Sequence, residues 1–167
     1  MESFQEVKEN RTNELEKFEI AKNDTSTYRN CAGFTRYMLG LDIKETLASP
    51  ETLANELNPI SFLPLNTEFP ENLEEEIYIE NAKSADAVAI RVNITKNDNP
   101  KNLSEIVNNT KSGEKYIHFA YIDPSNKKMI FQRPDLELKP EHTEWRGVLN
   151  DLEEFNGMEK RLVFFKK

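Results

Sequence analysis

The chain has 167 residues, of which 37% are hydrophobic and 10% aromatic, so it is expected to form one globular domain over 1–167 and is not an intrinsically disordered chain. Its net charge of −8, without a dense cluster of lysine and arginine, argues against a nucleic-acid partner. One cysteine and two histidines argue against a zinc site, and no cofactor is expected.

Membrane and export signals are also absent from the sequence. No apolar run approaches the roughly 20 residues that cross a bilayer. The N-terminal stretch MESFQEVKENRTNELEKF is charged throughout and lacks the apolar region of a signal peptide. We therefore expect a soluble protein with no membrane partner, which is cytoplasmic or is secreted by a signal-peptide-independent route.

The first third of the chain predicts three helices. Apolar residues recur at helical spacing over residues 2–21. A second helix is expected over 31–39, with Gly40 as its C-terminal stop. Ser49, Pro50 and Glu51 supply a capping hydroxyl, a first-turn proline and an acid, which predicts the start of a short third helix.

The middle of the chain changes from irregular structure to strands. Residues 59–82 contain three prolines and predict an irregular excursion with one short strand at Ile77–Ile79. Alternating apolar residues predict a strand over 86–94, and a short helix is expected near 103–107. Residues 115–122 are apolar on both faces apart from His118, which indicates a central strand.

The last third completes a mixed pattern. DPSNKK is turn chemistry, so 129–133 is expected to return as the hairpin partner of the preceding strand. Apolar residues from Trp145 to Phe155 have helical spacing and end at Asn156-Gly157, and RLVFF predicts a final strand. Helices followed by strands and one later helix predict an α+β fold with an antiparallel sheet.

The single cysteine lies where a helix should begin. Asn30 can cap that helix, which leaves Cys31 in the first turn. Free backbone N–H groups and the positive end of the helix dipole favour a thiolate there. A thiolate is the nucleophile of cysteine hydrolases and needs a base beside it, so Cys31 is the candidate nucleophile.

Two histidines are candidates for the base. His118 has a fixed direction in the middle of a strand, whereas His142 is expected to be exposed before a helix, so position favours His118. The returning strand offers Gln132 and Asp135 as residues that could orient the imidazole, and both stay open. Strict alternation puts His118 on one face with Tyr116 and Ala120, and Gln132 on one face with Ile130.

Three segments together resemble the NlpC-type cysteine peptidases and the related CHAP amidases. NCAGFTRYMLGLDI resembles their active-site helix, ADAVAIRV the following strand, and HFAYIDPSNKKMIFQRP their histidine hairpin, in the family's order. The resemblance covers about a third of the chain. It implies a papain-like fold, with an antiparallel sheet packed against N-terminal helices, and cleavage of amide bonds, typically in peptidoglycan stem peptides and cross-bridges.

The resemblance also suggests supporting roles and shows departures. Tyr28 corresponds to an upstream tyrosine that donates a hydrogen bond at the oxyanion site, although packing is an equal alternative, and Asn30 supports the site as helix cap. Ala85 replaces a glycine of the family pattern before Asp86, and Phe131 and Gln132 lie where the family has a second histidine.

Three functions stay open at this point. The first is a peptidoglycan hydrolase, which would act as a secreted effector and could have an immunity or inhibitor protein as partner. The second is a protease or deamidase with the same chemistry, directed at host or self proteins. The third is a papain-like interaction module without activity.

Overall fold

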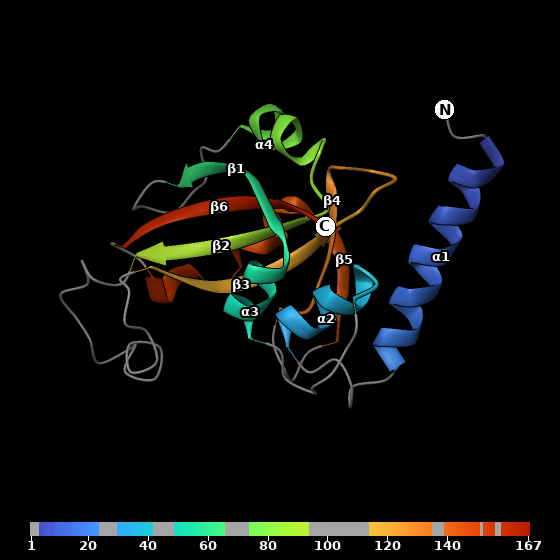
Figure 1. Cartoon of the computed structure of the whole chain (residues 1–167), viewed down its shortest axis with the longest axis horizontal. Helices are drawn as coiled ribbons and strands as arrows, with labels where there is room; N and C mark the ends of the chain where they lie inside the picture. The colour runs from blue at the N-terminus through green and yellow to red at the C-terminus, as the bar shows by residue number, and fades with distance from the viewer. Residues whose placement is uncertain are drawn as a thin grey trace.

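The computed structural model describes residues 4–23, 30–41, 49–65, 74–93, 114–134, 139–150, 152–155 and 158–167, with only the backbone described for 4–13, 114 and 153–154. Its centre is an antiparallel sheet with strand order β1-β6-β2-β3-β4-β5 (Figure 1). The strands are β1 Asn58–Leu65, β2 Ala87–Asn93, β3 Glu114–Ile122, β4 Met129–Gln132, β5 Glu141–Glu144 and β6 Glu159–Lys166. The prediction of an α+β fold with an antiparallel sheet is confirmed.

Buried apolar clusters lie on both faces of the sheet. The helices α1 (Phe4–Asn23), α2 (Cys31–Met38) and α3 (Pro50–Glu56) contribute Phe18, Phe34 and Leu53 to one buried cluster. On the opposite face, α4 (Glu75–Ala82) and two 3₁₀ segments, η2 (Trp145–Leu149) and η3 (Leu152–Phe155), form the other cluster. Alternate residues of the central strands β2 and β6 therefore face two different apolar layers, as the period of a β-strand requires.

The helix ends follow local chemistry. The Asn30 side chain accepts a hydrogen bond from Gly33 N at 2.7 Å, and the Ser49 hydroxyl caps α3 at Thr52 N. Gly40 has φ of +76°, the left-handed conformation that favours glycine after a helix. The predicted starts of α2 and α3 and the stop after α2 are confirmed.

Two predicted elements are wrong in type. Ile77–Ile79 is helical, in α4, because Tyr78 and Ala82 are one helical turn apart and are both buried. Residues 145–155 bury their apolar side chains as expected, but they form η2 and η3 in place of one helix. The chain is extended at Asn150 (φ −60°, ψ 145°), which separates the two segments.

Two strands were missed, β1 and β5. Pro59 and Pro64 suggested irregular structure, but β1 is an edge strand paired only with β6 in the described sheet, and an edge strand tolerates proline. The predicted short helix near 103–107 lies outside the described residues. No helix in the described ranges is long and apolar enough to span a membrane.

A β-bulge interrupts the pairing of β2 with β3. Ile90 pairs with His118 and Arg91 pairs with Tyr116, so Ile117 is the extra residue. The bulge reverses the phase of the strand. Ala120 packs with the cluster of α4 and η2, whereas Tyr116, an even number of residues away, packs with the cluster of α1–α3. The expectation that His118 shares a face with Tyr116 is therefore wrong.

Candidate active site

Cys31 is the first residue of α2 and is half-buried. The helix lies against β3, beyond the point where β4 stops pairing with that strand. In the described ladder, β3 and β4 pair only at Tyr121–Phe131 and Ile122–Ile130. The edge of β3 from Ala120 back to its start is consequently open to α2. Phe119 lies in this part of β3 that is not paired with β4, and its N–H donates to the Cys31 sulfur.

The surroundings of Cys31 favour a thiolate. Burial alone would raise the pKa of the thiol. The hydrogen bond to His118 and the positive charge of its imidazolium lower it, as do the N–H groups of Phe119 and Ala32. The balance lowers the pKa of Cys31 below its usual value, so the sulfur gains nucleophilic character near neutral pH.

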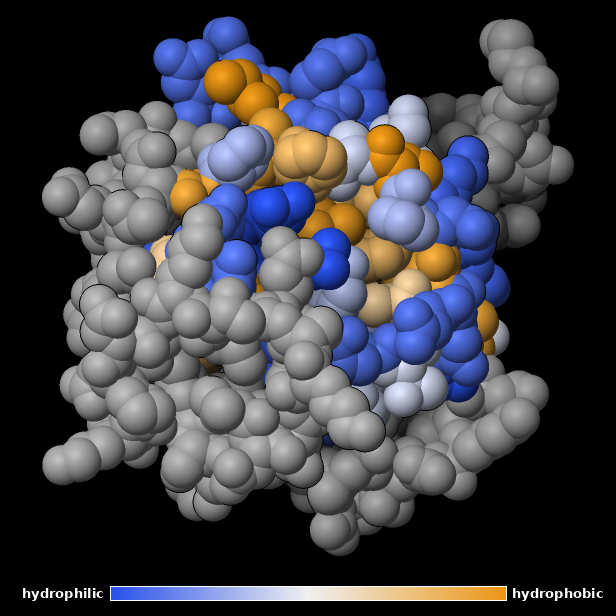
Figure 2. Space-filling model, turned by 60° about the vertical axis from the view of Figure 1, so that its left-hand side comes forward, coloured by the Kyte–Doolittle hydropathy of each residue, from blue (hydrophilic) through white to orange (hydrophobic). Residues whose placement is uncertain are grey.

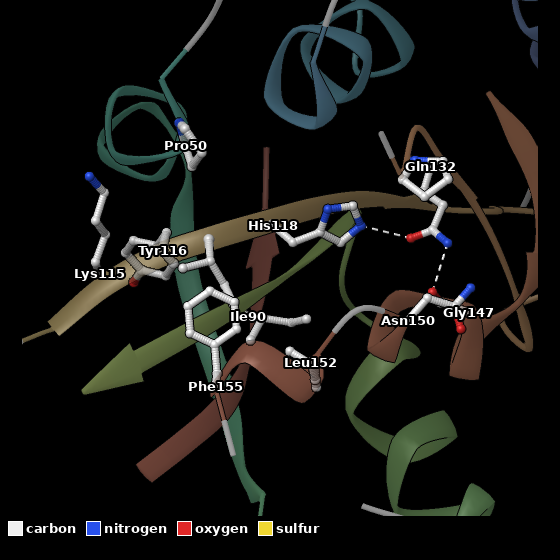
Figure 3. Close-up of a pocket in the computed structure, with 12 residues that line it drawn as sticks. Pro50, Ile90, Lys115, Tyr116, His118, Gln132, Gly147, Asn150, Leu152 and Phe155 are labelled. Carbon is white, nitrogen blue, oxygen red and sulfur yellow. Dashed lines mark hydrogen bonds between the residues drawn. The ribbon is translucent and has the colours of Figure 1, made fainter. Parts of the chain in front are cut away.

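The imidazole of His118 is held from two sides. Its Nε2 lies 2.7 Å from Gln132 Oε1. Figure 3 shows the second ring nitrogen, Nδ1, on the side of α2, in agreement with the bond to Cys31. His118, predicted from sequence as the base, and Gln132, predicted as one of two possible orienting residues, therefore lie with Cys31 in one chain of hydrogen bonds.

Gln132 is fully buried and its amide orientation is fixed. Its Nε2 donates to Glu141 Oε1 and to the Gly147 carbonyl, both at 2.8 Å. The amide oxygen is left to accept from His118, which places the imidazole proton on Nε2 and the lone pair on Nδ1, facing the thiol. This is the tautomer that a general base for Cys31 requires.

Sequence reasoning missed the supports of Gln132. A Cβ at Gly147 would lie 2.6 Å from Thr143 Cγ2 and 3.2 Å from Gln132 Nε2, so a larger residue there would crowd the carboxamide. A glycine within the apolar pattern of 145–155 was a signal for such close packing. Nothing in the sequence near Glu141 marked that carboxylate as a partner.

A cavity of about 330 Å³ lies beside the imidazole, at the open edge of β3. His118 and Gln132 form part of its wall (Figure 3). Its floor is apolar, with Ile90, Leu152 and Phe155, and Tyr116 and Lys115 lie toward the start of β3. A cavity with an apolar floor and a few convergent polar groups is the kind of place where proteins bind small ligands or side chains.

His142 does not take part in this site. It lies on β5, where its Nε2 contacts Asp123 Oδ2 at 2.9 Å and its ring stacks on Phe131 at 4.1 Å between centroids. Its side chain is 27% exposed, so the expectation of an exposed residue is wrong. The interaction with Asp123 and the packing of its ring give His142 a structural role.

Of the other predicted site residues, Asn30 caps α2. Tyr28 and Asp135 lie outside the described residues. Asp86 holds the start of β2, since its backbone bonds Phe165 and Ile122 and its carboxylate accepts from Lys167 N. Comparisons of the chain with protein-family models, with curated proteins and with solved structures found no match.

Proposed function

We propose that the chain is a cysteine hydrolase of amide bonds that uses Cys31, His118 and Gln132. The observation that carries the proposal is the orientation of His118, whose Nε2–H is committed to Gln132 while Nδ1 faces the thiol. A nucleophile, a base and a group that orients the base recur in hydrolases on unrelated folds. The resemblance to NlpC-type peptidases, which implies a papain-like arrangement of the site, points to the same chemistry.

The reaction follows from these contacts. Cys31 gives its proton to His118 Nδ1, and the sulfur attacks the carbonyl carbon of the amide. The C–N bond breaks as the imidazolium protonates the leaving nitrogen, and water activated by His118 then hydrolyses the thioester. The Cys31 N–H has no acceptor among the described residues and can donate to the oxyanion.

The cavity beside His118 fits an apolar side chain next to the scissile bond. Peptides therefore suit the site as substrates. Peptidoglycan stem peptides are the class that the resemblance implies, and intact proteins are the alternative.

The test compares the wild-type protein with Cys31→Ala. Both are incubated with purified peptidoglycan and with an unfolded protein such as casein. New amino termini are measured for peptide cleavage and ammonia for deamidation. We expect products from the wild type alone, and the substrate that yields them identifies the class.

A Cys31 thiol that alkylates only after denaturation would contradict the proposal. Identical behaviour of the two proteins on every substrate, with a native thiol as slow as a free cysteine, would favour an interaction module.

A further inference from the structure

Two backbone N–H groups on the open edge of β3 donate to side chains. The Phe119 N–H donates to the Cys31 sulfur. The Tyr116 N–H donates to Glu51 Oε1 at 2.6 Å. On a regular antiparallel strand, the N–H groups that face one neighbour recur at every second residue. These two donors are an odd number of residues apart, because the extra residue Ile117 lies between them.

Glu51 supplies the acceptor that a neighbouring strand would supply elsewhere. The described pairing of β4 with β3 does not reach Tyr116, so no β4 carbonyl meets its N–H there. Glu51 is the second residue of α3, and Pro50 before it lines the cavity beside His118 (Figure 3). A backbone N–H that is shielded from water and lacks an acceptor costs about as much free energy as a lost hydrogen bond. The carboxylate removes that cost at the bulge.

The contact between Glu51 and Tyr116 is half-buried and joins residues 65 positions apart. Figure 2 brings forward the side of the molecule where β3 begins, and hydrophilic residues lie beside apolar ones in this view. A hydrogen bond to a charged carboxylate is stronger than one to a neutral acceptor. The bond therefore ties the start of α3 to one backbone position of β3.

We propose that Glu51 is a positioning residue for His118, because its carboxylate holds the bulge of β3 in the phase in which the imidazole faces Cys31. The inference rests on the proposed function, since it adds a residue to the same site. Glu51 fixes Tyr116 on one side of the extra residue, and His118 pairs with Ile90 on the other side. Without this anchor the extra residue can move along β3, and a slip of one residue turns a side chain to the opposite face.

The first test measures the alkylation of Cys31 by iodoacetamide as a function of pH, and it needs no substrate. Glu51→Ala should move the profile to higher pH and slow alkylation at pH 7 several-fold, because the imidazole that lowers the pKa of Cys31 loses its place. Glu51→Gln keeps an acceptor oxygen and should retain most of the wild-type rate. An unchanged profile in Glu51→Ala would overturn the inference.

Two further variants separate positioning from the stability of α3. Ser49→Ala removes the hydroxyl that caps the helix at Thr52 N and does not touch β3, so it should lower the melting temperature and keep the wild-type alkylation profile. Equal shifts of the profile in Ser49→Ala and Glu51→Ala would assign the effect to the helix and overturn the inference. Glu51→Asp keeps the charge at the helix start but shortens the side chain. If Glu51→Ala does not fold, this variant takes its place with the same expected shift.

A second readout follows His118 itself, by NMR of the Nε2–H that donates to Gln132 in ¹⁵N-labelled protein. The signal should shift or broaden in Glu51→Ala and stay in place in Glu51→Gln. That response in a protein whose Cys31 is unreactive would uphold the positioning role while the proposed hydrolase fails. Active wild-type protein whose kcat, thiol profile and His118 signal are all matched by Glu51→Ala would leave the hydrolase standing and exclude the role of Glu51.

Discussion

The two histidines of this chain make similar hydrogen bonds and have different surroundings. Each presents Nε2 to a side-chain oxygen, His118 to Gln132 at 2.7 Å and His142 to Asp123 at 2.9 Å. The ring of His142 is stacked on Phe131 and meets the edge of Phe18. The ring of His118 faces the only cysteine of the chain across the open edge of β3.

The comparison shows that an oriented imidazole is not by itself a catalytic base. His142 has the stronger partner, because Asp123 is a buried carboxylate, yet it has a packing role. The difference lies in what the second ring nitrogen meets, and this depends on where the pairing of β3 with β4 ends. The predictions below test this difference, from the largest expected effect on the thiol to the smallest.

His118→Ala should change Cys31 the most. The lowered pKa of Cys31 means that a larger fraction of this thiol is ionised at a given pH than in an ordinary cysteine, and that this fraction falls on acidification. Without the imidazole, burial is opposed only by backbone N–H groups, so the midpoint of the alkylation profile should shift to higher pH. At pH 7 the rate with iodoacetamide should fall at least about tenfold. His142→Ala is the matched control and should retain the wild-type profile, so equal loss in both variants would contradict the distinction.

Gln132→Ala should reduce both hydrolysis and stability. It leaves His118, Glu141 and Gly147 without their partner, and unsatisfied buried groups cost about 1–3 kcal/mol. Gln132→Glu should lower hydrolysis and stability further than Gln132→Ala does, since the new carboxylate faces that of Glu141.

The double variant Gln132→Glu/Glu141→Gln restores a donor–acceptor pair and should recover part of both the melting temperature and the activity. Recovery of stability without activity would show that Gln132 supports the core and does not orient the base.

Gly147→Ala should have a smaller, several-fold effect on turnover. The added methyl group would lie 2.6 Å from Thr143 Cγ2, so that side chain or Gln132 must move. The double variant Gly147→Ala/Thr143→Ser removes the methyl group that is crowded and should restore most of the rate. Kinetics with the substrate identified for the wild type would measure the change, and an unaltered rate in Gly147→Ala would show that Gln132 tolerates displacement.

Asp123→Asn should leave the thiol unchanged and affect stability alone. The carboxylate accepts from Ser125 N, Ser125 Oγ and His142, and it is buried. We expect a loss of about 1–3 kcal/mol in denaturant unfolding, with the alkylation profile of the wild type. A slower thiol in this variant would mean that the two histidine regions are coupled.

The parts of the site that could be predicted are those set by local chemistry. Asn30 caps α2 and places Cys31 in the first turn, and alternation in 129–132 puts Ile130 and Phe131 in opposite clusters. The phase change at Ile117 could not be predicted, because a bulge depends on which strand pairs with β3.

Nonlocal packing also explains the other errors. Ile77, Tyr78 and Ile79 are β-branched and aromatic residues typical of a strand, but the stacking of Tyr78 on Trp145, at 4.3 Å between centroids, belongs to a helix lying on the sheet. The hydrogen bonds of Gln132 to Glu141 and Gly147 depend on β5 and η2, whose positions no sequence pattern showed.

The extra residue at Ile117 has a consequence for how this chain tolerates change. Because Ile117 is an extra residue in β3, the side chain of Tyr116 lies toward Arg91 and that of His118 lies toward Gln132. Deleting Ile117 would return the strand to a single phase, and one of the two contacts would be lost. Substitution of Ile117 by another aliphatic residue preserves the spacing. Deep mutational scanning should therefore find position 117 permissive to Val or Leu and intolerant of a one-residue deletion.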